Sequence, residues 1–293
     1  MVEDGAEGLA ELSAGLFPST GRARTIGLTG SPGVGKSTLA GELVRGARAR
    51  GFSAAVLAID PTSPFTGGAL LGDRVRMQDH ATDPGVFIRS MATRGHLGGM
   101  ALAAPEAVRI LDASGKDVVI VETVGVGQAE VDVAAATDTT LVVVAPGWGD
   151  AVQVAKAGIL EIADVFVVNK ADREGADAAV RDLEQMLRLG PELAWTPPVL
   201  KTAAASGEGA AELWDAVEAH RRHLEATGLL AEGRRARLLR EVESLTVEEL
   251  RGRVRALLEG DPDLAASLID RRTDPYRAAS LLTQRAATGW EGA

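Results

Sequence analysis

The chain has 293 residues, 46% of them hydrophobic and 25% charged, with a formal net charge of -10 at pH 7 and no cysteine. The acidic balance argues against a nucleic-acid partner, which needs a basic face opposite it, and the lack of cysteine excludes disulfides, thiolate metal sites and cysteine nucleophiles. Apolar runs such as Leu141–Pro146 are too short to cross a bilayer, and the acidic segment Met1–Ala14 lacks a signal-peptide pattern. We therefore expect a cytoplasmic protein that binds neither nucleic acid nor membrane.

Residues 1–23 form a short segment of their own. Leu9, Leu12 and Leu16 recur at roughly helical spacing, and Phe17–Gly21 contains the Pro and Gly that end a helix. This pattern predicts a short N-terminal helix ahead of the first strand.

Residues 24–227 alternate between short apolar runs and longer helical stretches. Continuous Val and Ile runs are typical of strands buried on both faces, as in parallel sheets. The expected strands are Thr25–Thr29, Ala54–Ile59, Val86–Ser90, Asp117–Val121, Thr140–Ala145, Val165–Val168 and Pro198–Thr202. The expected helices are Lys36–Arg50, Gly98–Ala113, Glu174–Leu189 and Ala210–Ala226. The alternation predicts a three-layer α/β fold with a mainly parallel sheet.

Residues 228–293 contain no strand signal and read as a helical appendage. The expected helices are Ala231–Glu243, Val247–Glu259, Asp263–Ile269 and Asp274–Ala287. Thr246, followed by two glutamates, resembles an N-cap with an acidic first turn. About 60 residues bury little core alone, so we expect this appendage to pack on the α/β domain or on a second copy of the chain. The run Arg234–Arg240 is interpreted as a solvated helix face or a contact with an acidic partner, and His220 with His223 as a polar helix face.

A phosphate-binding motif follows the first strand and opens the first long helix. The motif G-x-x-x-x-G-K-[ST] is matched by Gly30, Ser31, Pro32, Gly33, Val34, Gly35, Lys36 and Ser37, with Thr38 directly after it. Glycines let backbone N–H groups curl around phosphate oxygens, and the helix N-terminus adds partial positive charge. Lys36 is expected to reach the β- and γ-phosphates, and Ser37 to offer its hydroxyl to Mg²⁺. This loop predicts a P-loop NTPase.

A second motif predicts that the base is guanine. Asn169, Lys170 and Asp172 form N-K-x-D at the end of an expected strand. The carboxylate of Asp172 suits the two N–H donors on the Watson–Crick edge of guanine, whereas adenine cannot supply that pair. Asn169 and Lys170 are expected to brace the loop. A third loop follows the last strand, and its backbone N–H groups at Ala203, Ala204 and Ala205 are expected to close over the base.

Acidic residues near the phosphate loop suggest a metal and switch set. Glu122 and Gly125 stand where GTPases usually carry D-x-x-G, with Glu in place of Asp, and Asp60 ends another strand. Asp73 follows farther along the chain. Oxygen ligands of this kind suit a hard cation such as Mg²⁺. No glutamine directly follows Gly125, so the sequence favours slow intrinsic hydrolysis that needs a partner.

Several longer segments resemble one family, the methylmalonyl-CoA mutase-associated GTPases, relatives of the methylmalonic aciduria type A protein. The resemblance covers about Thr25 through Arg285. The matching segments are Ile59–Pro61, Gly67–Met77 (GGALLGDRVRM), Met91–Gly99 (MATRGHLGG), Val121–Glu130 (VETVGVGQAE), Gly147–Gly158 (GWGDAVQVAKAG) and Glu161–Asp172 (EIADVFVVNKAD). VETVGVGQ and GDRVRM are more diagnostic than the phosphate loop, which many NTPases share.

The resemblance implies a homodimeric P-loop GTPase with helical C-terminal arms that contribute to dimerisation. It implies that Lys36, Asp60, Asp73 and Glu122 stand at catalytic, nucleotide and Mg²⁺ positions, with Ser37, Asp60 and Glu122 as metal ligands. It also implies that Asp150, Gln153 and Lys156 belong to a mobile loop that signals to the partner. The expected partner is an adenosylcobalamin-dependent acyl-CoA mutase, with methylmalonyl-CoA mutase as the default. GTP hydrolysis would gate the loading of the cofactor, its protection, or the reactivation of the mutase.

Two other functions stay open at this point. One is a phosphotransferase that acts as a transport-protein kinase, although no acceptor site with a base is evident in the sequence. The other is a nickel-insertion GTPase, which needs His or Cys clusters, whereas this chain has four histidines and no cysteine.

Overall fold

The computed structural model describes residues 8–60, 77, 80, 82–92, 99–123, 129–147, 159–191 and 193–288. The chain divides into two compact units, Met1–Arg237 and Leu238–Ala293. Among the described helices, none is both long enough and apolar enough to span a membrane.

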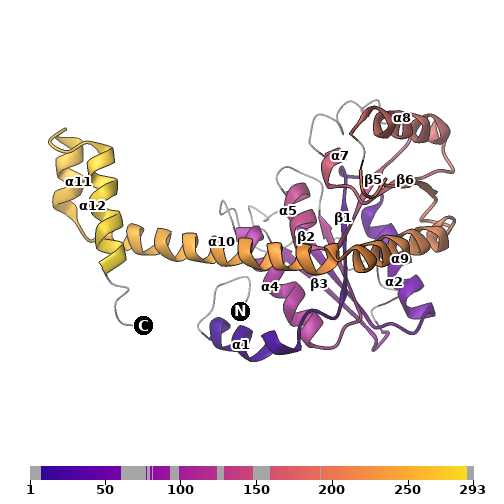
Figure 1. The fold of residues 1–293 in the computed structure, drawn as a ribbon, viewed down its shortest axis with the longest axis horizontal. Coiled ribbons are helices and arrows are strands. Elements are labelled where there is room, and N and C mark those ends of the chain that lie inside the picture. The colour runs from indigo at the N-terminus through magenta and orange to yellow at the C-terminus, as the bar shows by residue number, and fades with distance from the viewer. Residues whose placement is uncertain are drawn as a thin grey trace. The chain divides into compact units, whose positions relative to one another are not determined.

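The first unit is built on a seven-stranded sheet in which every neighbouring pair of strands is parallel (Figure 1). The strand order is β3-β2-β4-β1-β5-β6-β7. The strands are β1 (Arg24–Thr29), β2 (Ala54–Asp60), β3 (Val86–Ala92), β4 (Val118–Thr123), β5 (Thr139–Val144), β6 (Val165–Asn169) and β7 (Val199–Thr202). All seven expected strands are present, and the expected three-layer α/β fold is confirmed.

Helices cover both faces of this sheet, as Figure 1 shows. The described helices of the first unit, apart from the start of α10, are α1 (Leu9–Leu16), the 3-10 turn η2 (Phe17–Ser19), α2 (Lys36–Ala49), α4 (Gly99–Ala113), α5 (Ala129–Ala136), α7 (Ile159–Ile162), α8 (Ala176–Leu189) and α9 (Ala210–Thr227). One apolar core joins α2 and α9 to the sheet. Two further clusters join α4 and α5, and separately α8, to the alternate side chains of the same strands. The short helices α5 and α7 have no expected counterpart in the sequence analysis.

One aromatic side chain fixes the contact between α2 and α9. Trp214 of α9 is fully buried, and its indole N–H donates to the carbonyl of Leu43 in α2 at 3.0 Å. A Cβ at Gly46 would lie 2.0 Å from the indole ring, so only glycine lets the two helices approach this closely. The large ring thus fills a core whose other members are mostly Val, Leu and Ala.

The C-terminal helices differ from the expectation at one point. Two separate helices were expected between residues 231 and 259, but α10 is continuous from Leu229 to Glu259. Thr246 does not act as an N-cap, because its hydroxyl donates to the carbonyl of Val242 one turn earlier and so fits inside the helix. The expectation of a break at Thr246 was therefore wrong.

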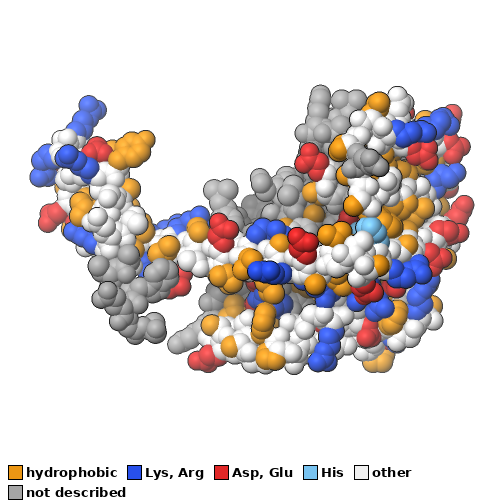
Figure 2. All heavy atoms as spheres, in the orientation of Figure 1, with side chains coloured by type: hydrophobic (Ala, Val, Ile, Leu, Met, Phe, Trp, Pro, Cys, Tyr) orange, Lys and Arg blue, Asp and Glu red, His pale blue; other side chains and the backbone are white. Residues whose placement is uncertain are grey.

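The second unit contains the rest of α10 and the helices α11 (Pro262–Ile269) and α12 (Pro275–Thr288). Asp261 caps α11, since its side chain accepts from the N–H of Leu264 at 2.9 Å. The same carboxylate accepts from Arg285 of α12 at 2.6 Å, which links the two helices. Among the described residues of the second unit, few apolar side chains are buried, and those are Ala278, Leu282 and Ala286. Figure 2 shows apolar side chains among charged ones on the surface of α10, α11 and α12.

Candidate functional site

The expected nucleotide-binding residues gather at the carboxyl edge of the sheet. Because all seven strands are parallel, the segments after β1, β4, β6 and β7 emerge at this same edge. The phosphate loop follows β1 and the alanine loop follows β7, whereas Glu122 lies near the end of β4 and the guanine motif begins at the last residue of β6. Ligands of open α/β sheets bind outside the carboxyl ends of the strands.

The phosphate loop depends on glycines at particular backbone positions. Gly30, Gly33 and Gly35 have φ values of 132°, 79° and 98°, which side chains other than glycine rarely allow. A Cβ at Gly30 would lie 2.1 Å from the carbonyl oxygen of Val143, so the loop also passes very close to β5. The helix α2 begins directly after Gly35, and its first N–H groups are therefore available to an anion.

The side chain of Lys36 folds over its own loop. Its ammonium group donates to the carbonyl of Gly30 at 2.6 Å and to that of Ser31 at 2.9 Å, and the residue is only 5% exposed. The positive charge is thus held at the mouth of the loop, where phosphate oxygens would meet the backbone N–H groups.

Ser37 and Glu122 form the oxygen pair beside the loop. The hydroxyl of Ser37 donates to Oε1 of Glu122 at 2.7 Å, and both residues are buried. Glu122 lies on β4 in register with Leu28 of β1 and Ala58 of β2. A hydroxyl next to a carboxylate fits a hard cation such as Mg²⁺. Among the described residues, no group of three or more His, Cys, Asp and Glu side chains is placed to hold a metal ion.

Of the remaining expected site residues, the structure describes the backbone of Asp60. Asp60 is the last residue of β2, directly after the pair of Ile59 with Thr123, so its backbone is at the same edge. Several others lie outside the described residues, and they are Asp73, Gly125, Asp150, Gln153 and Lys156.

The guanine motif is hydrogen-bonded to the phosphate loop. The amide of Asn169 donates to the carbonyl of Val34 at 2.8 Å, and the ammonium of Lys170 donates to that of Gly33 at 2.6 Å. Lys170 has a φ of 59°, which turns the chain sharply at the end of β6. Asp172, two residues later, is exposed. Its carboxylate is thus accessible, whereas Asn169 and Lys170 brace the loop.

Asn169 also holds the alanine loop. Its side-chain oxygen accepts from the hydroxyl of Thr202 and from the N–H of Ala204, both at 3.1 Å. Ala203 and Ala204 are buried, whereas Ala205 is exposed. The sequence analysis did not predict a role for Thr202. Its one local signal is that it is a polar residue at the end of a strand, directly before a run of small residues.

A phosphate loop between β1 and α2, with N-K-x-D at the end of β6 of the same parallel sheet, defines a P-loop GTPase. The chain matches the family model described as Methylmalonyl Co-A mutase-associated GTPase MeaB over residues 3–259, and it belongs to this family. The resemblance noted in the sequence is therefore confirmed.

Related proteins agree with this assignment. A protein of Pyrococcus horikoshii that is named as a GTPase is 51% identical over 274 residues, which cover 92% of this chain and 86% of that protein. The mouse methylmalonic aciduria type A homolog, mitochondrial, is 34% identical over 266 residues, which cover 88% of this chain and 64% of the mouse protein. A solved structure of a LAO/AO transport system kinase superposes with a TM-score of 0.71 at 28% identity, and covers 94% of this chain and 85% of its own.

Proposed function

We propose that this GTPase gates adenosylcobalamin loading, protection or reactivation of an adenosylcobalamin-dependent acyl-CoA mutase, with methylmalonyl-CoA mutase as the expected partner. The observation that carries the proposal is the family itself, whose description names association with methylmalonyl-CoA mutase. The mouse relative is named for methylmalonic aciduria, which agrees with a role near that mutase.

GTP would be held by the two loops that Asn169 joins. In this proposal, the backbone N–H groups of residues 30–38 surround the phosphates, and Lys36 turns from the carbonyls of Gly30 and Ser31 toward the phosphate oxygens. The carboxylate of Asp172 reads the guanine edge, and the N–H groups of residues 203–205 close over the base. The exposure of Asp172 and the bracing by Asn169 support this division of roles.

Ser37, Glu122 and Asp60 would hold Mg²⁺, and Asp73 would be a further acidic residue of the site, a role that rests on the family resemblance alone. The fit rests on the 2.7 Å approach of the Ser37 hydroxyl to the Glu122 carboxylate in a buried place. When bound, the ion neutralises the charge that develops on the β- and γ-phosphate oxygens. The roles proposed for Gly125 and for the partner-signalling residues Asp150, Gln153 and Lys156 rest on the family resemblance alone.

The proposed assembly is a homodimer formed through the C-terminal arm, residues 228–293. On α10, Leu238, Val242 and Leu245 recur at i, i+4 and i+7, so they share one helix face, and all three are exposed. On α11 and α12, Ile269 and Tyr276 are 80% and 89% exposed. Apolar surface of this kind favours a covering partner, and a second copy of the chain is the proposed one.

One alternative has a specific observation in its favour. The solved structure that superposes with a TM-score of 0.71 is named as a transport system kinase, which would place a phosphotransferase on this fold. A kinase transfers the γ-phosphoryl group to an acceptor hydroxyl, whereas a GTPase releases it to water. The nickel-insertion alternative gains no support from the described residues, in which no three or more His, Cys, Asp and Glu side chains are grouped to hold a metal ion.

The deciding experiment combines turnover with partner binding. Purified protein is incubated with GTP and Mg²⁺ and with adenosylcobalamin-dependent methylmalonyl-CoA mutase, and free phosphate, phosphoprotein and complex formation are measured. We expect phosphate release without phosphoprotein, and a complex whose affinity differs between GDP and a non-hydrolysable GTP analogue. Lys36→Ala should lose hydrolysis, and Lys170→Ala, at a half-buried residue whose ammonium group braces the phosphate loop, should weaken nucleotide binding less severely. A labelled phosphoprotein would overturn the GTPase-switch proposal in favour of the kinase, and equal mutase binding in both nucleotide states would overturn the gating.

A further inference from the structure

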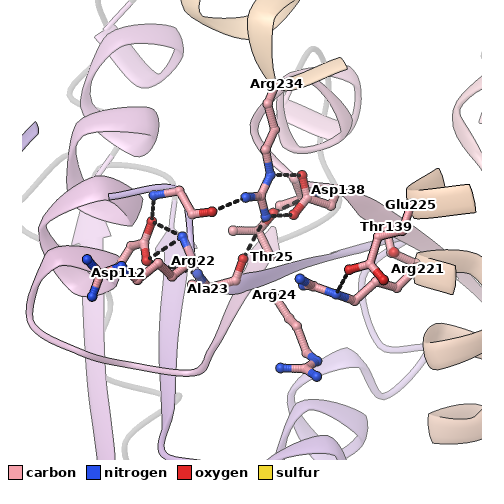
Figure 3. Close-up of polar contacts among 12 residues, drawn as sticks. Arg22, Ala23, Arg24, Thr25, Asp112, Asp138, Thr139, Arg221, Glu225 and Arg234 are labelled. Carbon is pink, nitrogen blue, oxygen red and sulfur yellow. Dashed lines mark hydrogen bonds and ion pairs between the residues drawn. The ribbon is translucent and has the colours of Figure 1, made fainter. Parts of the chain in front are cut away.

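The three residues that lead into β1 are held from both sides (Figure 3). The carboxylate of Asp112 in α4 accepts from the backbone N–H groups of Gly21, Arg22 and Ala23, the last at 2.9 Å. Arg234 of α10 donates to the carbonyls of Gly21 and Ala23, the latter at 2.8 Å. One acidic side chain therefore accepts from all three N–H groups of this segment, and one basic side chain donates to two of its three carbonyls.

The same guanidinium of Arg234 also binds the buried carboxylate of Asp138. Its Nε and Nη2 atoms donate to the two oxygens of Asp138 at 3.1 and 2.5 Å, the two-point geometry that arginine forms with a carboxylate. Arg237 donates to Asp138 as well, and to the carbonyl of Thr137 at 3.0 Å. Burial would raise the pKa of Asp138, but the hydrogen bond and charge of Arg234, with the charge of Arg237, outweigh burial and hold the pKa below its usual value.

Asp138 is at the same time the point where β5 starts beside β1. Its backbone N–H donates to the carbonyl of Thr25 at 3.0 Å and to the hydroxyl of Thr25 at 2.8 Å. The paired register of β1 and β5 begins one residue later, with Ile26 opposite Thr139. Arg234 therefore joins β1 and β5 at their amino ends. It contacts β1 through the segment that precedes it and β5 through Asp138.

The opposite ends of these two strands carry the phosphate loop. The register continues to Thr29 opposite Val142, and Gly30 then passes so close to Val143 that a Cβ would lie 2.1 Å from its carbonyl oxygen. The backbone of Gly30 therefore lies in close contact with β5, at a distance that only a residue without a Cβ allows. A displacement at the amino ends is transmitted along the paired backbones to this contact, because interiors this closely packed transmit strain.

We propose that Arg234 and Asp138 are positioning residues of the nucleotide site, which fix β1 against β5 at one edge of the sheet and thereby set the place of the phosphate loop at the other. The C-terminal helix α10 thus supplies a side chain on which GTP binding and turnover depend, although Arg234 touches no part of the nucleotide site. This inference rests on the proposed phosphate-binding role of residues 30–38.

The test compares two neighbouring arginines of the same helix. Arg234→Gln removes the charged fork, and Arg235→Gln makes the same chemical change at the next residue, which is exposed. GDP affinity, and kcat and KM for GTP, are measured with Mg²⁺ at a temperature at which circular dichroism shows all variants fully folded. We expect Arg234→Gln to weaken GDP binding and lower kcat/KM by about 3- to 10-fold, since residues that act at a distance change coupling to that extent. Arg235→Gln should stay close to the unmodified protein in both.

A purely structural role would give a different result. Arg234→Gln would then lower the melting temperature but leave GDP affinity, KM and kcat unchanged in the folded range, and this outcome would overturn the proposal. If Arg234→Gln fails to fold, Arg234→Lys carries the same comparison, because lysine keeps the charge but not the two-point contact, and an intermediate loss is expected. In the Asp138→Asn background, the effect of Arg234→Gln on GDP affinity should be smaller, since both substitutions disrupt the same contact between Arg234 and Asp138.

The same assays separate this inference from the proposal on which it rests. If Lys36→Ala binds GDP normally, the phosphate-loop assignment is wrong. If Lys36→Ala loses GDP binding while Arg234→Gln and Arg234→Lys match the unmodified protein, the phosphate loop stands and only the positioning role is wrong.

Discussion

The side-chain amide of Asn169 donates to the carbonyl oxygen of Val34 at 2.8 Å, a hydrogen bond between residues 135 positions apart in the chain. The oxygen of the same amide accepts from Thr202 and Ala204. One buried side chain therefore ties the phosphate loop, the guanine motif and the alanine loop together. The relative position of three loops depends on it before any nucleotide contact is considered.

The first prediction concerns the stability that Asn169 provides. Asn169→Ala leaves the Val34 carbonyl and the Thr202 and Ala204 donors without their partner in a buried place. We expect the free energy of unfolding to fall by about 2–3 kcal/mol, because each buried group left without a partner costs about 1–3 kcal/mol and the site relaxes in part. Urea denaturation without nucleotide measures this. An unchanged midpoint would show that the three loops are held by other contacts.

The second prediction concerns Asp172, three residues away in the same motif. Asp172 is exposed, so Asp172→Asn should change the free energy of unfolding by no more than about 0.5 kcal/mol. The carboxamide presents a donor where guanine also presents donors, so we expect weaker GTP binding and measurable binding of xanthine nucleotides, which offer an acceptor there. Competition binding with GTP and XTP tests this, and unchanged GTP affinity would contradict the guanine-reading role.

Much of the fold could be predicted from the sequence because its signals are local. The strands are continuous apolar runs, such as Val165–Val168, which a parallel sheet buries on both faces. The break expected at Thr246 failed because a threonine hydroxyl can donate to the carbonyl one turn back as readily as it can cap a helix. The two glutamates after Thr246 fit a first turn and a helix interior equally well, so the local pattern did not decide between them.

In the site too, features that depend on adjacent residues could be predicted, and features that depend on distant residues could not. The motif at Gly30–Ser37 and N-K-x-D are recognisable because their residues are adjacent in the chain. The hydrogen bond from Arg234 to Asp138 joins residues 96 positions apart, and no local pattern in either segment predicts it. The run Arg234–Arg240 was expected to be a solvated helix face or a contact with an acidic partner. The solvated face was wrong for Arg234 and Arg237, whose side chains are partly buried against Asp138 of the same chain. A helix face that contacts the domain looks the same in sequence as one that contacts water.

The third prediction separates two causes of glycine dependence in the phosphate loop. Gly30 has a φ of 132° and no room for a Cβ, which would lie 2.1 Å from the carbonyl oxygen of Val143. Gly33 has a φ of 79° with open space around the same position. Both alanine variants carry backbone strain of about 1–3 kcal/mol, but only Gly30→Ala also clashes with β5. We expect Gly30→Ala to lose at least about 2 kcal/mol of unfolding free energy and Gly33→Ala to lose less, as measured by thermal and urea denaturation. Equal losses would show that Val143 moves away at little cost.

The fourth prediction concerns a half-buried acid, Asp164, and a buried histidine, His220, at the amino ends of β5 and β6. His220 is 2% exposed, which contradicts the expected polar helix face, and its Nδ1 lies 3.0 Å from the hydroxyl of Thr139. Its Nε2 lies 3.3 Å from Oδ1 of Asp164, whose other oxygen accepts from the N–H of Thr140 at 2.7 Å. Burial raises the pKa of Asp164 to about 7 and lowers the pKa of His220 to about 4. Both directions favour an uncharged pair over an ion pair.

The two shifts have opposite consequences for stability. The folded state holds a proton on Asp164 that the unfolded chain releases near pH 4, so this stability is lost as pH rises toward about 7. The unfolded chain holds a proton on His220 below its ordinary pKa of 6.5 that the folded state has lost, so stability falls as pH drops toward about 4. The slopes oppose each other below about pH 6.5, which leaves a net loss of stability between about pH 6.5 and 7.5 from Asp164 alone.

Asp164→Asn isolates this contribution, because an amide mimics the protonated acid, still accepts from Thr140 and cannot ionise. We expect the difference in unfolding free energy between pH 8 and pH 6.5 to be smaller in Asp164→Asn than in the unmodified protein, and the variant to be the more stable of the two at pH 8. Asp177→Asn is the matched control, since Asp177 is an exposed acid whose pKa is lowered by its hydrogen bond to Lys201 and so does not titrate in this range. Equal pH profiles for the unmodified protein and Asp164→Asn would mean that Asp164 keeps its charge in the folded state, held by His220 as an ion pair.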